Sequence, residues 1–293
     1  METVELNITD FMEISKSNDV TSRLALIRTL ISRGIQLPYT ILSRGAEILA
    51  NKGGSMGDEK WTLMERVLLA AIKLDVEPWV GYCLSTLRNQ FPNSERVERL
   101  SALYRESKED WVEAESIYTS MLRKAPENMY ARKRLIACLK AQGRLKDAIS
   151  SIIDQLDVFS ADSELWHELS MLYMGQCSYT KAASAFEEVL LADPKSFYNL
   201  LVYAEMEFSA GEVDLARKYY CKALEYRSNE PRALWGLVTC LQEQSLLSKK
   251  LDAKEGKIIA QLKAETKKRL EMIYSSVNTE SAKLCLKMLR RIE

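Results

Sequence analysis

Apolar positions along the chain follow a helical period that is itself repeated at a longer interval. Within residues 163–194, apolar side chains spaced at i, i+3, i+4 and i+7 predict two amphipathic helices. An alanine recurs at equal spacing along the chain, and a bulky residue follows each alanine by four positions. The alanines are Ala114, Ala148, Ala182 and Ala216, and the bulky residues are Tyr118, Ile152, Phe186 and Tyr220. Because a methyl group lets two helices cross closely while a large neighbour fills the space beside the crossing, this pair predicts how successive helices pack.

Residues that favour turns lie in phase with the alanines, and we call this set of equivalent positions the repeat grid. They are Pro92, Pro126, Pro194, Ser160 and Ser228 at the ends of units, and Gly143 and Gly211 between the two helices of a unit. Proline ends a helix because its ring blocks the preceding turn and it lacks an N–H, and glycine supplies the permissive backbone of a tight turn. A period of about 34 residues, held over at least four units, indicates stacked helical hairpins. The sequence therefore predicts an all-α fold, a tetratricopeptide-repeat superhelical solenoid with helical caps.

The repeat divides the chain into three predicted segments. Residues 1–58 form an N-terminal helical cap and loop, residues 59–246 hold about five repeats with degenerate outer units, and residues 247–293 form C-terminal capping helices. In the first repeat Val80 stands where the alanine belongs, and Pro78 suits the first turn of a second helix. One hairpin cannot bury its apolar stripe alone, so the neighbouring hairpins and the two caps must cover it.

The two flanks carry weaker patterns. Residues 20–33 and 37–50 read as short helices, and the turn-rich residues 51–57 read as an exposed loop. After residue 247 the chain is rich in lysine, which favours a solvated helix that shields the last repeat. The apolar stripe expected on this helix is Ile258, Ile259, Leu262, Leu270 and Ile273. A last helix is expected to begin near Asn278 or Thr279.

Charge and apolar content exclude several classes of partner. The chain has 41 basic and 41 acidic residues, so no overall field attracts nucleic acid. No run of about 18 apolar residues is present that could span a bilayer, and the first residues lack a basic and then apolar signal region. We therefore expect a cytosolic or nuclear protein with no direct membrane span. The six cysteines contain no Cys-x-x-Cys pair, which argues against zinc and redox motifs.

The sequence holds little that points to catalysis. Its one histidine, His167, follows Trp166 within a repeat helix, so a structural or groove-lining role is favoured over a catalytic one. Gly256-Lys257 lacks the upstream glycine of a phosphate-binding loop. We expect no enzyme activity, no cofactor and no metal site, and a repeat array of this kind favours binding.

Several short sequences go beyond the generic repeat pattern and resemble one family. They are Arg-Lys-Arg at 132–134, Lys-Ala-Gln-Gly at 140–143, Trp-His-Glu-Leu at 166–169, Leu-Arg-Asn-Gln-Phe-Pro at 87–92 and Arg232–Leu237. On these motifs residues 60–240 resemble subunit 2 of the endoplasmic-reticulum (ER) membrane protein complex. The resemblance implies a non-catalytic scaffold, peripheral on the cytoplasmic face of the ER membrane. It also implies that the chain binds cytosolic segments of membrane-embedded subunits, its partners being other subunits of that complex, and supports insertion of tail-anchored and multi-spanning proteins.

The repeat phase places one side of each first helix away from its neighbours, and we expect a protein-binding groove there. The groove residues predicted are Arg99, Tyr130, Lys133, His167, Met171, Tyr198, Leu201, Glu205 and Phe208. This surface is basic at its start and apolar or acidic further on.

Two other functions compete with the scaffold. A tetratricopeptide co-chaperone needs lysine and asparagine clamps, but its lysine positions read Arg99, Lys133, His167 and Leu201 here, and its asparagine positions read Leu103, Ala137, Met171 and Glu205. The clamp is absent. A role as an auxiliary subunit of a soluble enzyme remains an alternative. Affinity purification in gentle detergent would distinguish the scaffold, the co-chaperone and the auxiliary subunit by the partners recovered.

Overall fold

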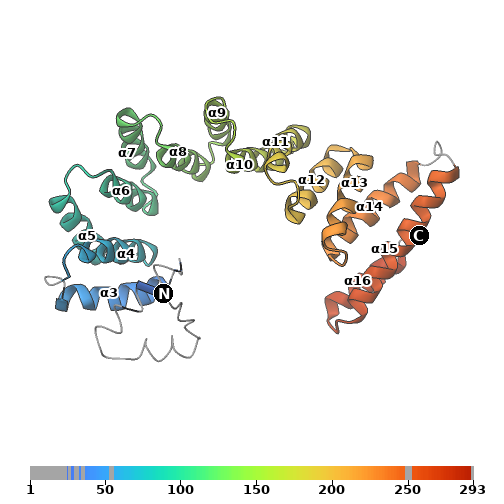
Figure 1. The fold of residues 1–293 in the computed structure, drawn as a ribbon, viewed down its shortest axis with the longest axis horizontal. Coiled ribbons are helices and arrows are strands. Elements are labelled where there is room, and N and C mark those ends of the chain that lie inside the picture. The colour runs from blue at the N-terminus through green and yellow to red at the C-terminus, as the bar shows by residue number, and fades with distance from the viewer. Residues whose placement is uncertain are drawn as a thin grey trace, which may run out of the picture. The chain divides into compact units, whose positions relative to one another are not determined.

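The structure is a computed structural model that describes residues 25, 28, 29, 33, 37–52, 56–247 and 253–291. Throughout these ranges every regular element is a helix (Figure 1). The helices are α3 (Pro38–Lys52), α4 (Glu59–Lys73), α5 (Glu77–Gln90), α6 (Glu95–Ser107), α7 (Trp111–Lys124), α8 (Met129–Ala141), α9 (Leu145–Leu156), α10 (Ser163–Gly175), α11 (Tyr179–Ala192), α12 (Phe197–Ala210), α13 (Val213–Tyr226), α14 (Pro231–Leu247), α15 (Ala253–Ser275) and α16 (Glu280–Arg291). The expected all-α fold is confirmed.

The chain divides into two compact units, Met1–Arg144 and Leu145–Glu293. In the first unit α3 packs on α4, and the hairpins α4–α5 and α6–α7 lead to α8. In the second unit α9 packs on α10, the hairpins α10–α11 and α12–α13 follow, and α14 packs against both α13 and α15. Each unit therefore has its own stacked hairpins and its own core.

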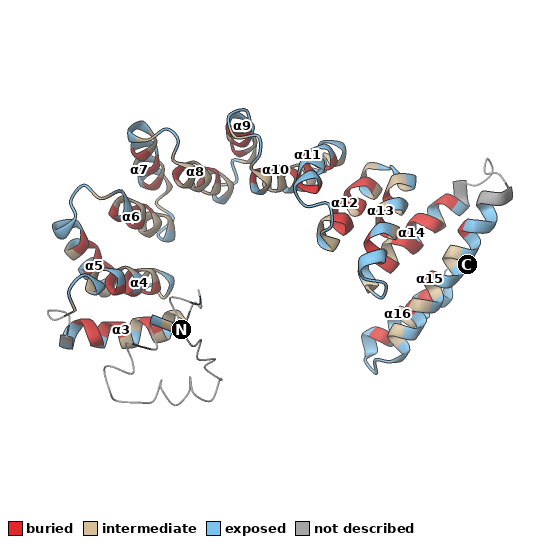
Figure 2. Cartoon of the chain, viewed as in Figure 1, coloured by how far each residue is buried: buried red, intermediate tan, exposed pale blue. Residues whose placement is uncertain are grey.

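The predicted packing code is confirmed in both cores. The four alanines on the repeat grid are fully buried, and the bulky residue one turn after each is at most 3% exposed. Val80, the substitute for alanine in the first unit of the repeat, is buried as well. Figure 2 shows the result as one buried face on most helices and exposed turns between them.

The turns inside the repeats share one backbone conformation. A left-handed residue with φ between 55° and 94° follows the first helix of each repeat, and these residues are Asp75, Glu109, Gly143, Cys177 and Gly211. All five occupy the same position of the repeat grid, and Asp75 and Glu109 extend the grid through the two repeats with degenerate sequences. Only two of the five are glycine, so the other three accept the cost of a left-handed backbone on a residue with a Cβ.

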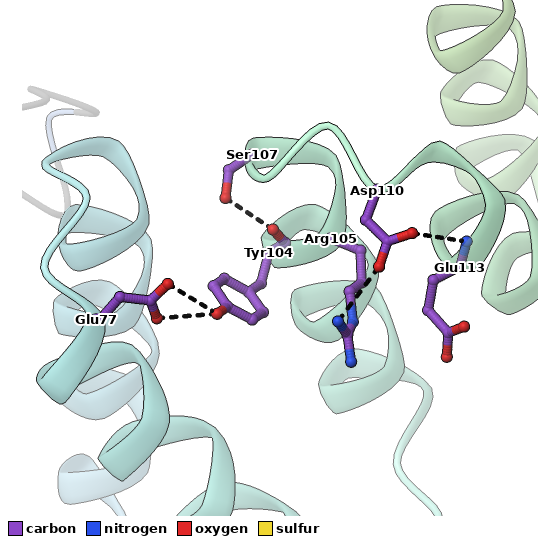
Figure 3. A network of polar contacts seen from close by, with 6 residues as sticks. All are labelled: Glu77, Tyr104, Arg105, Ser107, Asp110 and Glu113. Atoms are coloured by element: carbon purple, nitrogen blue, oxygen red, sulfur yellow. Dashed lines mark hydrogen bonds and ion pairs between the residues drawn. The ribbon is translucent and has the colours of Figure 1, made fainter.

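The turn around Glu109 shows how such a corner is held (Figure 3). Arg105 pairs with Asp110 at 3.3 Å, and the Asp110 carboxylate caps α7 by accepting the Glu113 N–H. Tyr104 Oη donates to the Glu77 carboxylate at 2.9 Å, which joins α6 to α5. Hydrogen bonds from Lys108 and then Tyr104 lower the pKa of Glu77, so this acid stays charged.

The flanking segments agree with expectation in part. The helical pattern at 37–50 is α3, the pattern at 20–33 lies mostly outside the described residues, and α3 runs two residues into the predicted loop. At the other end Ile259 and Leu270 of α15 are buried against α14. Ile258, expected in the same stripe, is 58% exposed. The last helix begins at Glu280, with the Thr279 hydroxyl accepting the Ala282 N–H, as expected.

Candidate protein-binding groove

In the first unit the predicted groove residues lie on two neighbouring first helices, α6 and α8. The Arg99 guanidinium sits over the Tyr130 ring, 3.7 Å from its centroid, so these two residues are brought together. Asn128, which caps α8, also donates to Glu95 of α6 at 2.5 Å. Lys133 lies one turn along α8 from Tyr130 and is half-buried. The result is a basic and aromatic surface across α6 and α8.

A partly buried ion pair fixes the register of these two helices. Arg134 of α8 donates to Glu106 of α6, with Nε to Oε1 at 3.1 Å, and Tyr118 of α7 donates to the same carboxylate. Burial, and then the hydrogen bond to Glu106, raises the pKa of Tyr118 far above its usual range. Glu106 thus holds three helices in one arrangement behind the exposed surface.

In the second unit the predicted groove residues lie on α10 and α12. Met171 and Tyr198 are 47% and 54% exposed, and Phe208 is half-buried against the core of α12 to α14. The His167 ring lies 5.7 Å from that of Phe186 and is half-buried, so it belongs to the wall of this surface. These residues form an apolar and aromatic surface.

Two features of the second unit correct the predicted surface. Leu201 is only 2% exposed and packs in the core with α13 and α14, so it is not available to a partner. Glu205 accepts two bonds from Arg232 of α14, Nε to Oε1 and Nη2 to Oε2, each at 2.6 Å. This pairing offsets the acidic charge that the sequence assigned to the groove.

Two arginines were missed by the sequence reasoning. Arg232 stands one full repeat after Tyr198, and Arg96 stands one full repeat before Tyr130, so the same grid places both on the surface. Arg96 pairs with Glu65 of α4, and Arg232 with Glu205 of α12. The signal was present in the repeat: Arg96 lies on the same helix as Arg99, at the grid position of Tyr130, and extending the grid by one repeat after Tyr198 reaches Arg232.

The described residues offer little for catalysis or for a metal. No group of three or more His, Cys, Asp or Glu side chains is placed to hold an ion in the part of the chain that the structure describes. Burial raises the pKa of Cys83, Cys138 and Cys240 to about 12, so these thiols are protonated at neutral pH. A thiol in that state is a poor nucleophile. Within the described ranges, no helix is both long and apolar enough to cross a bilayer.

Comparison with known proteins identifies relatives of the chain. The model of the EMC2 TPR-like repeat domain matches residues 80–226. ER membrane protein complex subunit 2-A of Xenopus laevis is 38% identical over 200 residues, which is 67% of each chain. ER membrane protein complex subunit 2 of Dictyostelium discoideum is 33% identical over 207 residues, which is 69% of this chain and 64% of the relative. The TPR repeat protein oca3 of Schizosaccharomyces pombe is 29% identical over 203 residues, covering 68% and 72%.

A solved structure supports the fold. The C-terminal part of a TPR repeat-containing protein from Cytophaga hutchinsonii aligns with a TM-score of 0.61 over 90% of this chain and 98% of that one. Its sequence identity is 14%, so the likeness concerns the tetratricopeptide-repeat fold alone.

Proposed function

The chain belongs to the ER membrane protein complex subunit 2 family, and from this premise we propose that it is a non-catalytic scaffold subunit of that complex. The family match is the observation that carries the proposal. In this role the chain sits at the cytoplasmic face of the ER membrane and is held there by its partners. It binds cytosolic segments of membrane-embedded subunits and so supports the insertion of tail-anchored and multi-spanning proteins.

The exposed faces of the first helices are the surface that we propose for these segments. The first unit offers Arg99, Tyr130 and Lys133, and the second offers Met171 and Tyr198 among its apolar groups. A disordered tail must lose conformational entropy when it binds, and an extended surface offsets that cost with a large contact area. The surface of the first unit favours an acidic segment, and the surface of the second unit favours an apolar one.

Purification of the tagged chain in gentle detergent tests the assignment. Multi-spanning partners belonging to the ER complex are expected, and they should remain with the chain at moderate salt. The chain itself should leave the membrane pellet on alkaline carbonate extraction. Recovery of soluble chaperones, or of a soluble enzyme, in place of multi-spanning proteins would contradict the scaffold role.

Charge reversal tests the surface on the first unit. Arg99→Glu with Lys133→Glu should reduce the recovery of partners several-fold, because repulsion replaces attraction for an acidic segment. Lys133→Glu alone leaves the contact between Arg99 and Tyr130 in place and should show a smaller loss. A matched control is Arg123→Glu with Lys146→Glu, which makes the same charge change at exposed positions on second helices. Equal recovery from the groove variant and the control, with equal melting curves, would refute this surface.

A further inference from the structure

A second concave surface lies away from the first-helix faces, between α13 and α15 of the second unit. It encloses about 470 Å³. One face of α13 provides Arg217, Lys218, Cys221, Lys222 and Glu225, and α15 provides Leu262. The residues of α13 are spaced at i, i+1, i+4, i+5 and i+8, so the groove runs along the helix for more than two turns.

The repeat grid relates this face of α13 to the same face of the preceding second helix, α11. In the preceding hairpin Ala183 of α11 occupies the grid position of Arg217, and it is only 4% exposed because the next hairpin covers it. No further hairpin on the grid follows α13, since the chain continues from α14 into the 23-residue helix α15. Arg217 takes this position on α13, and 26% of its side chain is exposed.

The charges of the groove are mostly positive and partly unpaired. Arg217 pairs with Asp214 at 3.8 Å, and Glu225 is the one acid among the lining residues. Lys218 and Lys222 are exposed, and neither forms an ion pair with any residue that the structure describes. These two ammonium groups lie one helical turn apart and face the same side of α13.

The floor between them is apolar. Cys221 and Leu262 both pack against the core cluster of α12 to α16. Burial raises the pKa of the Cys221 thiol, so it adds no negative charge at neutral pH. A ligand for this groove thus needs an apolar stripe next to carboxylates.

We propose that the groove between α13 and α15 binds an acidic amphipathic helix of a partner protein. Its apolar stripe covers Cys221 and Leu262, and its carboxylates meet Lys218 and Lys222. A helix is favoured over an extended segment because the lining side chains of α13 form one straight face of more than two turns, against which a second helix can pack. This surface is separate from the proposed tail-binding faces of α6, α8, α10 and α12, so the two can be tested independently.

A designed peptide tests the chemistry directly. The probe is a fluorescent amphipathic peptide of about 15 residues, or four turns when helical, with leucine at i, i+3, i+4 and i+7, four glutamates beside this stripe and alanine elsewhere. A second peptide replaces every glutamate by glutamine. Binding to the full chain is followed by fluorescence anisotropy. The glutamate peptide should bind at least about tenfold more tightly than the glutamine peptide, and added salt should weaken it.

Variants locate the binding site. Lys218→Glu with Lys222→Glu should raise the Kd of the glutamate peptide by about tenfold or more, a change equivalent to about 1.4 kcal/mol. Lys146→Glu with Lys195→Glu makes the same charge change at exposed positions elsewhere in the unit and should leave the Kd within about twofold. If the variant with both glutamates fails to fold, Lys218→Gln with Lys222→Gln tests the same site, and a smaller loss of affinity for the glutamate peptide is expected.

Three results would overturn the proposal. Equal binding of the two peptides would show that charge plays no part, and equal loss in the groove variant and its control would place the site elsewhere. The third is that the glutamate peptide does not bind, whereas the chain binds vesicles of phosphatidylserine and phosphatidylcholine in a way that depends on Lys218 and Lys222. That result would make the groove a contact for anionic lipid instead.

Discussion

A single added methyl group tests the packing of the last two repeat helices. Gly236 lies in α14, opposite Tyr220 of α13, the last bulky residue of the repeat grid. A Cβ at Gly236 would lie 2.3 Å from both Cε1 and Cζ of Tyr220 and 2.8 Å from its Oη. The Tyr220 ring is almost completely buried, so it has little room to turn away. We expect Gly236→Ala to destabilise the second unit.

The size of the effect follows from two opposing terms. Ordinary contacts of a Cβ begin at 3.4 Å, so the ring or the helix must move by about 1 Å. Overpacking of this kind costs about 1–3 kcal/mol. Replacing glycine inside a helix returns up to about 1 kcal/mol, because alanine loses less backbone entropy on folding. The expected net change is a loss of up to about 2 kcal/mol in the free energy of unfolding.

A matched substitution separates the two terms. Gly256 lies in α15 of the same unit, and a Cβ there would meet nothing within 4 Å. Gly256→Ala should therefore show the helix-propensity gain alone. The difference between the two variants reports the overpacking cost, about 1–3 kcal/mol.

Urea denaturation followed by far-ultraviolet circular dichroism gives both free energies of unfolding, and the slopes show whether the transition keeps its cooperativity. If Gly236→Ala is as stable as Gly256→Ala, then α14 does not approach α13 as described. The packing code would then fail at the last repeat.

Three further outcomes are expected. Gly211→Ala should cost about 1–2 kcal/mol, because φ is 94° there, and denaturation of the variant measures this. Glu106→Gln should destabilise the first unit by about 2 kcal/mol, as measured from its melting curve. Breaking a fully buried pair typically costs about 3–5 kcal/mol, and the smaller value is expected here because Arg134 keeps a third of its side chain exposed. The buried thiols should make the protein less stable above about pH 9. Their pKa is about 9 in the unfolded chain and about 12 in the folded one, so the unfolded state loses protons first as the pH rises. Denaturation at increasing pH should show that their contribution to stability is complete below pH 9 and falls above it. These thiols are Cys83, Cys138 and Cys240.

The architecture was predictable because it rests on a repeated local rule. The small and large pair seen at Ala182 and Phe186 recurs along the grid, and burial at each of these positions follows from helical geometry alone. The sequence indicated the left-handed turn conformation at only some of the repeats. Gly143 and Gly211 indicate a left-handed residue, whereas Glu109 adopts the same conformation without any signal in its residue type.

The groove was harder to predict because exposure depends on the neighbouring helix. Leu201 has the same repeat phase as His167, yet α13 and α14 cover Leu201, whereas His167 on α10 is half-exposed. The repeat phase gives the direction of a side chain, and the length and side chains of the next helix decide whether it is covered. Glu205 shows the same limit for charge, because its partner Arg232 stands 27 residues away.

These pairings change how the groove would hold a partner. Arg99 already contacts Tyr130, and Glu205 is already bonded to Arg232, so a bound tail must compete with contacts inside the array. A new ion pair at Glu205 or Arg232 then replaces an existing one, and one at Arg99 competes with its contact to the Tyr130 ring, so the net contribution of each to affinity is small. Met171 and Tyr198 are exposed by about half, and covering them removes apolar surface from water without breaking such a pair. In the first unit the charged surface should therefore guide the approach and orientation of an acidic segment, whereas a segment bound to the second unit should draw most of its binding energy from the cover of apolar surface.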